Sequence, residues 1–115
     1  TRRSSDLLQN DGIMLAVYYD VDAAKIIHQL DSWEKINDSP TISSILKNVS
    51  SYFGLDFVIP EIASGNFFLY DNSQHKELRS EAEMNTLLLH SEDVNFSLVV
   101  WDDEKHTIYI VEYRI

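Results

Sequence analysis

The clearest element in the sequence is an amphipathic helix that begins near Ser39. Ser39 is a typical N-cap residue, Pro40 suits the first helical position, and Gly54 suits the cap at the other end. Between them, apolar side chains recur at helical spacing: Ile42, Ile45, Leu46, Val49 and Phe53. A helix with one apolar face must pack against another element, and strand-like segments on both sides of it supply that element.

Those strand-like segments are bounded by turn-forming residues. Residues 13–19 are apolar and aromatic, and residues 67–70 form a second such run after the helix. A short strand is predicted over 77–79. Residues 95–101 and 107–113 flank a charged five-residue turn, which predicts a terminal antiparallel hairpin. The last strand ends at the chain terminus, and we expect it to lie at a sheet edge that a partner strand could extend.

Two further segments have sequence patterns typical of helices. Ser80 followed by Glu83 has the capping-box pattern and predicts a short helix that continues through Leu88. Residues 23–36 fit either a helix or a second strand, because their apolar residues follow helical spacing while residues 20–23 could equally form a hairpin turn. The pattern leaves both structures open.

Length and composition predict one α+β domain. The chain has 115 residues, of which 44% are hydrophobic, and we assign residues 1–12 to a polar N-terminal tail and residues 13–115 to a single domain. The absence of cysteine excludes disulfides, thiolate metal sites and cysteine nucleophiles, and it favours a reducing compartment. No apolar run approaches the roughly 20 residues of a membrane span, so no membrane insertion is expected. We expect a domain of a larger intracellular protein, cytoplasmic or nuclear.

Charge restricts the class of partner. The formal net charge is −10, and residues 56–115 contribute −8 of it, from four basic and twelve acidic residues. An acidic surface repels phosphate backbones and anionic lipids, so no nucleic acid partner is expected. A protein partner is the remaining expectation.

A family resemblance appears in the middle of the chain. The run Thr41–Val49 with residues 52–55, then residues 68–71 and then residues 96–99, resembles the Ras-association class of ubiquitin-like domains. The resemblance implies a β-grasp, in which one principal helix packs on a mixed or antiparallel sheet. It also implies a small GTPase as partner, bound at the edge of the second strand. The contact residues that it implies are Lys25, His28, Lys35 and Lys47.

The acidic C-terminal half offers a different binding surface. Acidic residues gather near and within the predicted turn of the terminal hairpin: Glu92, Asp93, Asp102, Asp103 and Glu104. They could recruit a basic protein or peptide segment, although a run of charges is also what a solvated turn requires. A small acidic inhibitor or immunity-type protein that blocks a basic partner is the alternative function.

The sequence contains no recognisable catalytic machinery. Its four histidines lie far apart in the chain, and its three glycines form neither a phosphate-binding loop nor a nucleotide fingerprint. We therefore predict no catalytic residues, no metal and no cofactor. Trp33 and Trp101 fit either core packing or a surface anchor for a partner, and packing is the main expectation. The predicted function is a non-catalytic protein-interaction or scaffolding domain, acting through a sheet edge or the acidic face.

Overall fold

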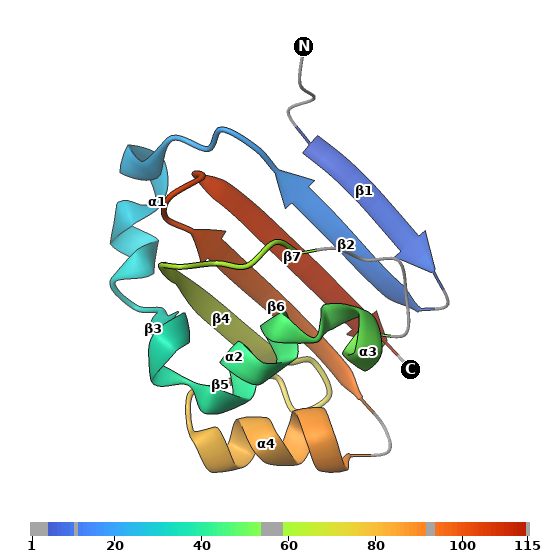
Figure 1. The fold of residues 1–115 in the computed structure, drawn as a ribbon. Coiled ribbons are helices and arrows are strands. Elements are labelled where there is room, and N and C mark those ends of the chain that lie inside the picture. Colours follow the sequence, from blue (N-terminus) through green and yellow to red (C-terminus); the bar gives the residue numbers. More distant parts are fainter. Residues whose placement is uncertain (1–4, 11, 54–58, 92–93, 115) are drawn as a thin grey trace.

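A seven-stranded antiparallel sheet organises the described part of the chain (Figure 1). The computed structural model describes residues 5–10, 12–53, 59–91 and 94–114. The strands follow the order β1-β2-β7-β6-β4-β3, and β5 pairs with β4 on a separate branch. Their bounds are Ser5–Asn10 for β1, Ile13–Tyr18 for β2, Glu34–Lys35 for β3, Gly65–Asp71 for β4, Lys76–Leu78 for β5, Asn95–Asp102 for β6 and Thr107–Arg114 for β7. The predicted α+β class is confirmed.

Helices α2 (Pro40–Lys47), α3 (Val49–Phe53) and α4 (Glu81–His90) lie against one face of this sheet (Figure 1). The core fills the layer between the sheet and these helices. From the sheet it takes alternate side chains of the long strands, such as Leu15, Leu69, Leu98 and Val111. The helices contribute Ile42, Ile45, Met84, Leu87 and Leu88. Burying each such side chain stabilises the fold by about 1.5–3 kcal/mol, so this layer supplies most of the driving force for folding.

The segment that sequence patterns left open is a helix. Helix α1 spans Ala23–Leu30, and the Asp22 carboxylate accepts a hydrogen bond from the Ala24 N–H at 3.0 Å, as an N-cap does. The chain then forms the two-residue strand β3 and a short 3-10 helix over Ile36–Asp38 before α2 begins. Helical spacing was therefore the correct indicator for residues 23–30.

The predicted principal helix is divided in two. Ser39 caps α2 as expected, since its hydroxyl accepts a hydrogen bond from the Ile42 N–H at 3.2 Å. At Asn48 the backbone leaves the helical region, with φ −128° and ψ 42°, and the Asn48 side-chain amide donates back to the Ser44 carbonyl at 3.0 Å. An asparagine that bonds to the preceding turn competes with the helix and ends it. The predicted cap at Gly54 lies outside the described residues.

The two ends of the chain differ from the sequence-based expectations. Residues 5–10, assigned to a polar tail, form β1 and extend the sheet; the Tyr19 hydroxyl helps to hold this strand by donating to the Asp6 carboxylate at 2.8 Å. The last strand, β7, lies in the interior of the sheet between β2 and β6. The expectation of an edge there was wrong, because the hydrogen-bonding groups on both sides of β7 are already used by neighbouring strands.

Glu81 links the N-terminal ends of α2 and α4. Its Oε2 accepts hydrogen bonds from the Thr41 hydroxyl at 2.7 Å and from the Thr41 N–H at 3.2 Å. Burial works to raise the pKa of this carboxyl, but hydrogen bonds from Ser39 and Thr41 outweigh it and hold the pKa below its usual range. The folded state therefore favours the ionised form, and the carboxylate satisfies an N–H in the first turn of α2.

Replacing Glu81 by glutamine (Glu81→Gln) should lower the free energy of unfolding at pH 7 by about 1 kcal/mol. A carboxylate whose pKa is lowered by folding stabilises the native state above its unfolded pKa of about 4.3, and this contribution is lost as the pH falls through the lowered folded pKa. The difference between the two proteins should therefore shrink in acid. Urea unfolding at pH 7 and at pH 3 measures it.

The matched control is Glu83→Gln in the same helical turn, where an exposed carboxylate meets the Lys76 ammonium group at the surface. It should change stability by about 0.5 kcal/mol or less. A loss of the same size at both pH values in Glu81→Gln would contradict the assignment.

Candidate interaction surface

The face of the sheet opposite α2, α3 and α4 is the candidate functional site. Successive side chains of a strand point to opposite faces, and directly paired residues share a face. Because Leu15, Leu98 and Val111 belong to the core, their neighbours along the strands point the other way. We call this second face of β1, β2, β7, β6 and β4 the open face.

The strand register arranges the open face in rows that run across five strands. The middle row is apolar from end to end: Phe68, Val99, Ile110, Ala16 and Leu7 are paired in that order from β4 to β1. The next row, on the side of the turn between β6 and β7, contains Asn66, Trp101, Ile108, Tyr18 and Ser5. The row on the other side is mixed: Tyr70, Ser97, Glu112, Met14 and Gln9.

Most side chains on these rows retain solvent exposure, whereas those of Ala16 and Trp101 are buried. Leu7 is 63% exposed and Tyr18 is 43% exposed, while Phe68, Val99 and Ile110 are half-buried between their neighbours. An antiparallel sheet with one solvated face normally places polar residues on that face. Contiguous exposed apolar patches larger than a few hundred Å² are uncommon on monomers, and the largest apolar patch of a protein is often a binding site.

Aromatic side chains occupy one corner of the open face. Trp101 is fully buried there; its ring stacks on His106 with 5.6 Å between ring centroids, and its indole N–H donates to Asp103 at 3.3 Å. Trp33 lies against Phe68 at 6.1 Å, and Phe68 stacks on Tyr70 at 6.4 Å. Both tryptophans pack within the domain, as the sequence analysis expected.

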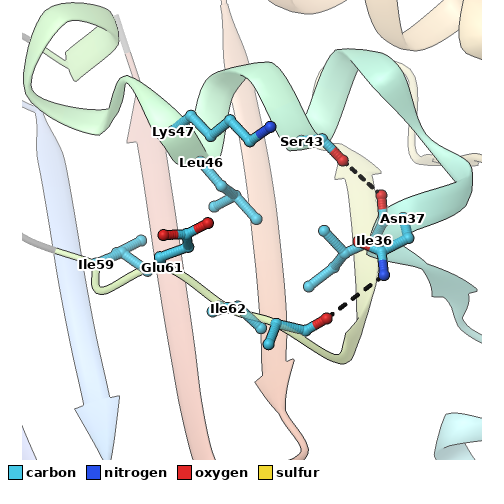
Figure 2. A pocket seen from close by; sticks show the side chains of 9 residues that line it. Ile36, Asn37, Ser43, Leu46, Lys47, Ile59, Glu61 and Ile62 are labelled. Carbon is cyan, nitrogen blue, oxygen red and sulfur yellow. Dashed lines mark hydrogen bonds between the residues drawn. The ribbon is translucent and has the colours of Figure 1, made fainter.

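On the helix side, a cavity of about 470 Å³ opens between α2 and the segment that leads into β4 (Figure 2). Its walls include the apolar side chains of Ile36, Leu46, Ile59 and Ile62. Of its polar groups, the Ser43 hydroxyl donates to the Ile36 carbonyl at 2.8 Å and the Asn37 amide donates to the Ala63 carbonyl at 3.5 Å. Lys47 and Glu61 are the ionisable groups in the lining.

The residues implied by the Ras-association resemblance come from three different elements. Lys25 and His28 are exposed on α1, Lys35 is exposed in β3, and Lys47 is exposed at the end of α2, where it lines the cavity. The resemblance places the docking strand between residues 23 and 36. In that segment the structure has α1 and a strand of only two residues, so the expected binding edge is short.

The predicted acidic patch is only partly at the surface. Asp103 and Glu104 are exposed in the turn between β6 and β7, and Glu92 and Asp93 lie outside the described residues. Asp102 is 1% exposed, and its Oδ1 accepts hydrogen bonds from the N–H groups of Glu104 and Lys105 at 3.0 and 3.2 Å. Its carboxylate is therefore committed to the turn, and its assignment to a docking surface is corrected.

The turn between β4 and β5 is built in the same way. Asp71 is buried and accepts from the N–H groups of Ser73 and Gln74 at 3.0 and 3.2 Å. In both turns a histidine follows in the left-handed region, His75 at φ 53° and His106 at φ 49°. A buried aspartate that satisfies two turn N–H groups explains why acids recur at these two positions.

The sequence did hold a signal for the open face. The runs Phe96–Trp101 and Thr107–Val111 are apolar at nearly every position, whereas a strand with one solvated face alternates apolar and polar residues. Such a run is typical of a strand that is covered on both faces. The sequence analysis assigned the aromatic and aliphatic residues to one core and so missed the second surface.

Comparisons of the chain with protein-family models, with curated proteins and with solved structures give no match. Within the described residues, no helix has the length and apolar character needed to cross a membrane. In the same part of the chain, no three His, Asp or Glu side chains gather as a metal site would require.

Replacing Asp102 by alanine (Asp102→Ala) should destabilise the domain by about 1–3 kcal/mol, because two turn N–H groups lose their acceptor. Glu104→Ala removes the same charge from the same turn but leaves those bonds intact, so it should cost about 0.5 kcal/mol or less. Thermal unfolding of the two variants measures the difference. In a domain of roughly this size, each kcal/mol of lost stability lowers Tm by about 4–8 °C. Equal shifts in the two variants would contradict the structural role of Asp102.

Proposed function

We propose that this chain is a non-catalytic protein-interaction domain that binds a protein partner through the open face of its sheet. The observation that carries the proposal is the continuous apolar row from Phe68 to Leu7, which lies on the face of the sheet opposite α2, α3 and α4. Association removes such a surface from water, and this is the main favourable contribution to most protein–protein contacts.

The composition of the open face supports a protein as the occupant. Partly exposed aromatic side chains, Tyr18, Phe68 and Tyr70, lie among aliphatic ones, and aromatic residues are enriched where interfaces gain most of their affinity. The polar groups of the mixed row are already organised: the Ser97 hydroxyl donates to the Glu112 carboxylate at 2.6 Å. A rim that is hydrogen-bonded in the free protein loses little when a partner covers the apolar centre.

The earlier hypotheses place binding elsewhere and stay predictions. The Ras-association resemblance predicts a ubiquitin-like β-grasp and a GTPase contact through Lys25, His28, Lys35 and Lys47. The acidic turn predicts a basic partner at Asp103 and Glu104, as would an inhibitor or immunity-type protein. These contacts centre on α1, β3, the end of α2 or the turn between β6 and β7 and not on the apolar row, so the position of the partner separates them from the proposed contact.

Site-directed photo-crosslinking in cells tests the position of the partner. A benzophenone amino acid in place of Tyr18, an exposed aromatic residue of the open face, should give covalent adducts of higher mass with a protein partner. The matched control places the same group at Ile27, an apolar α1 residue outside the open face that is 53% exposed. We expect abundant adducts at Tyr18 and few at Ile27, because the proposed contact covers the first residue and not the second.

A second substitution makes the test specific. Adding Ile110→Lys at the centre of the open face should abolish the Tyr18 adducts, because it places an unpaired charge in the apolar contact. Circular dichroism and a thermal melt verify that this variant folds. Absence of adducts at Tyr18, or equal adducts at Tyr18 and Ile27, would overturn the proposed function.

A further inference from the structure

We infer that the partner at the open face is a second copy of this chain, so that two sheets pack face to face in a symmetric dimer. This inference rests on the proposed function, since it names the occupant of the same surface. It is carried by the charge of the face, by its area and by the position of its central residue.

The open face is neutral although the chain is strongly acidic. Among the described residues of β1, β2, β4, β6 and β7 that point to this side, the charged ones are Glu112 and Arg114, which have opposite signs. The net charge of −10 therefore lies elsewhere on the chain. A basic partner would gain nothing from this face, whereas a second copy meets a surface that is equally apolar and equally neutral.

The area of the face agrees with a modest dimer contact. Five strands about 4.8 Å apart and three rows about 6.7 Å apart cover about 24 Å by about 20 Å, or close to 500 Å² per copy. Because Trp101 and Ala16 within this area are already buried, two copies together would bury at most about 1,000 Å², near the lower limit for a specific interface. A contact of this size is consistent with a dissociation constant in the micromolar range, about 1–100 μM.

Strand order places one residue at the centre of the contact. Ile110 belongs to the middle row and to β7, the third of the five strands, so it has two strands and one row on each side. In a two-fold symmetric interface the same patch is used by both partners, and the axis passes through its centre. Ile110 of one copy then lies close to Ile110 of the other, where contacts contribute most to affinity.

Self-association through a neutral face has a distinctive salt dependence. The remaining charge of each copy repels that of the other across the assembly, and added salt screens this repulsion. Raising the NaCl concentration from about 50 mM to about 500 mM should therefore strengthen the dimer severalfold. A contact between acidic and basic surfaces would weaken over the same range.

The experiment is sedimentation equilibrium of the purified chain up to about 100 μM, which is the upper end of the range of dissociation constants expected of such an interface. We expect a concentration-dependent rise from 13.3 kDa towards twice that mass. Ile110→Lys and Ile110→Glu should each remain monomeric, with dimerisation weakened at least ten-fold. An equimolar mixture of the two variants should recover the dimer, because the introduced lysine and glutamate then face each other across the axis.

Ile27→Lys and Ile27→Glu are the matched controls, and both should dimerise like the unmodified chain. Three results would overturn the inference: an unmodified chain that stays monomeric at about 100 μM, a dimer that Ile110→Lys leaves intact, or a dimer that weakens with salt. If the chain is monomeric and Tyr18 still forms adducts with a different protein, the dimer is refuted and the proposed function is not. If Tyr18 forms no adducts, the proposed function itself is refuted.

Discussion

The position of β7 between β2 and β6 is the constraint on which the rest of the structure depends. Through these two antiparallel pairings the last strand connects the N-terminal hairpin, β1 and β2, to the later strands β6 and β4. Without β7 the sheet would divide into two parts, one with β1 and β2 and the other with β6, β4, β3 and β5. Its central place also gives it two covered edges, so its backbone cannot receive a partner strand and any binding by β7 must use side chains.

Acidic residues contribute to this architecture as structural acceptors and not only as surface charge. Asp71 and Asp102 each satisfy two N–H groups of a turn, and the Glu81 carboxylate satisfies an N–H at the start of α2. Buried or partly buried carboxylates are tolerated because each accepts more than one hydrogen bond. A count of acids in the sequence therefore overstates the charge that is free to attract a basic partner.

Local signals predicted most individual elements. Ser39 with Pro40 and Ser80 with Glu83 marked the starts of α2 and α4 because caps depend on a few adjacent residues. The strands β2, β4, β6 and β7 followed from short apolar runs. The break at Asn48 was missed because the apolar periodicity continues through it, and β1 was missed because its residues are mostly polar and it becomes a strand by pairing with β2.

Long-range placement was the part that sequence patterns could not supply. Whether β7 lies at an edge or in the interior depends on which strands pair with it, and no run of residues near position 110 encodes that choice. The candidate site could not be predicted from the sequence for the same reason. The open face joins Leu7, Ala16, Phe68, Val99 and Ile110 from five strands, and its continuous apolar row exists only once the register of all five is known.

Under the proposed function, the separation of charge from the apolar surface gives different parts of the molecule different tasks. Acids outside the open face keep the chain hydrated and repel indiscriminate association, which a flat apolar sheet would otherwise invite. The face itself carries one Glu and one Arg at its polar end, so a correct partner meets no uncompensated charge in the centre. Long-range repulsion with short-range apolar attraction selects partners by shape, because only a surface that matches the rows closely gains enough contact to overcome the repulsion.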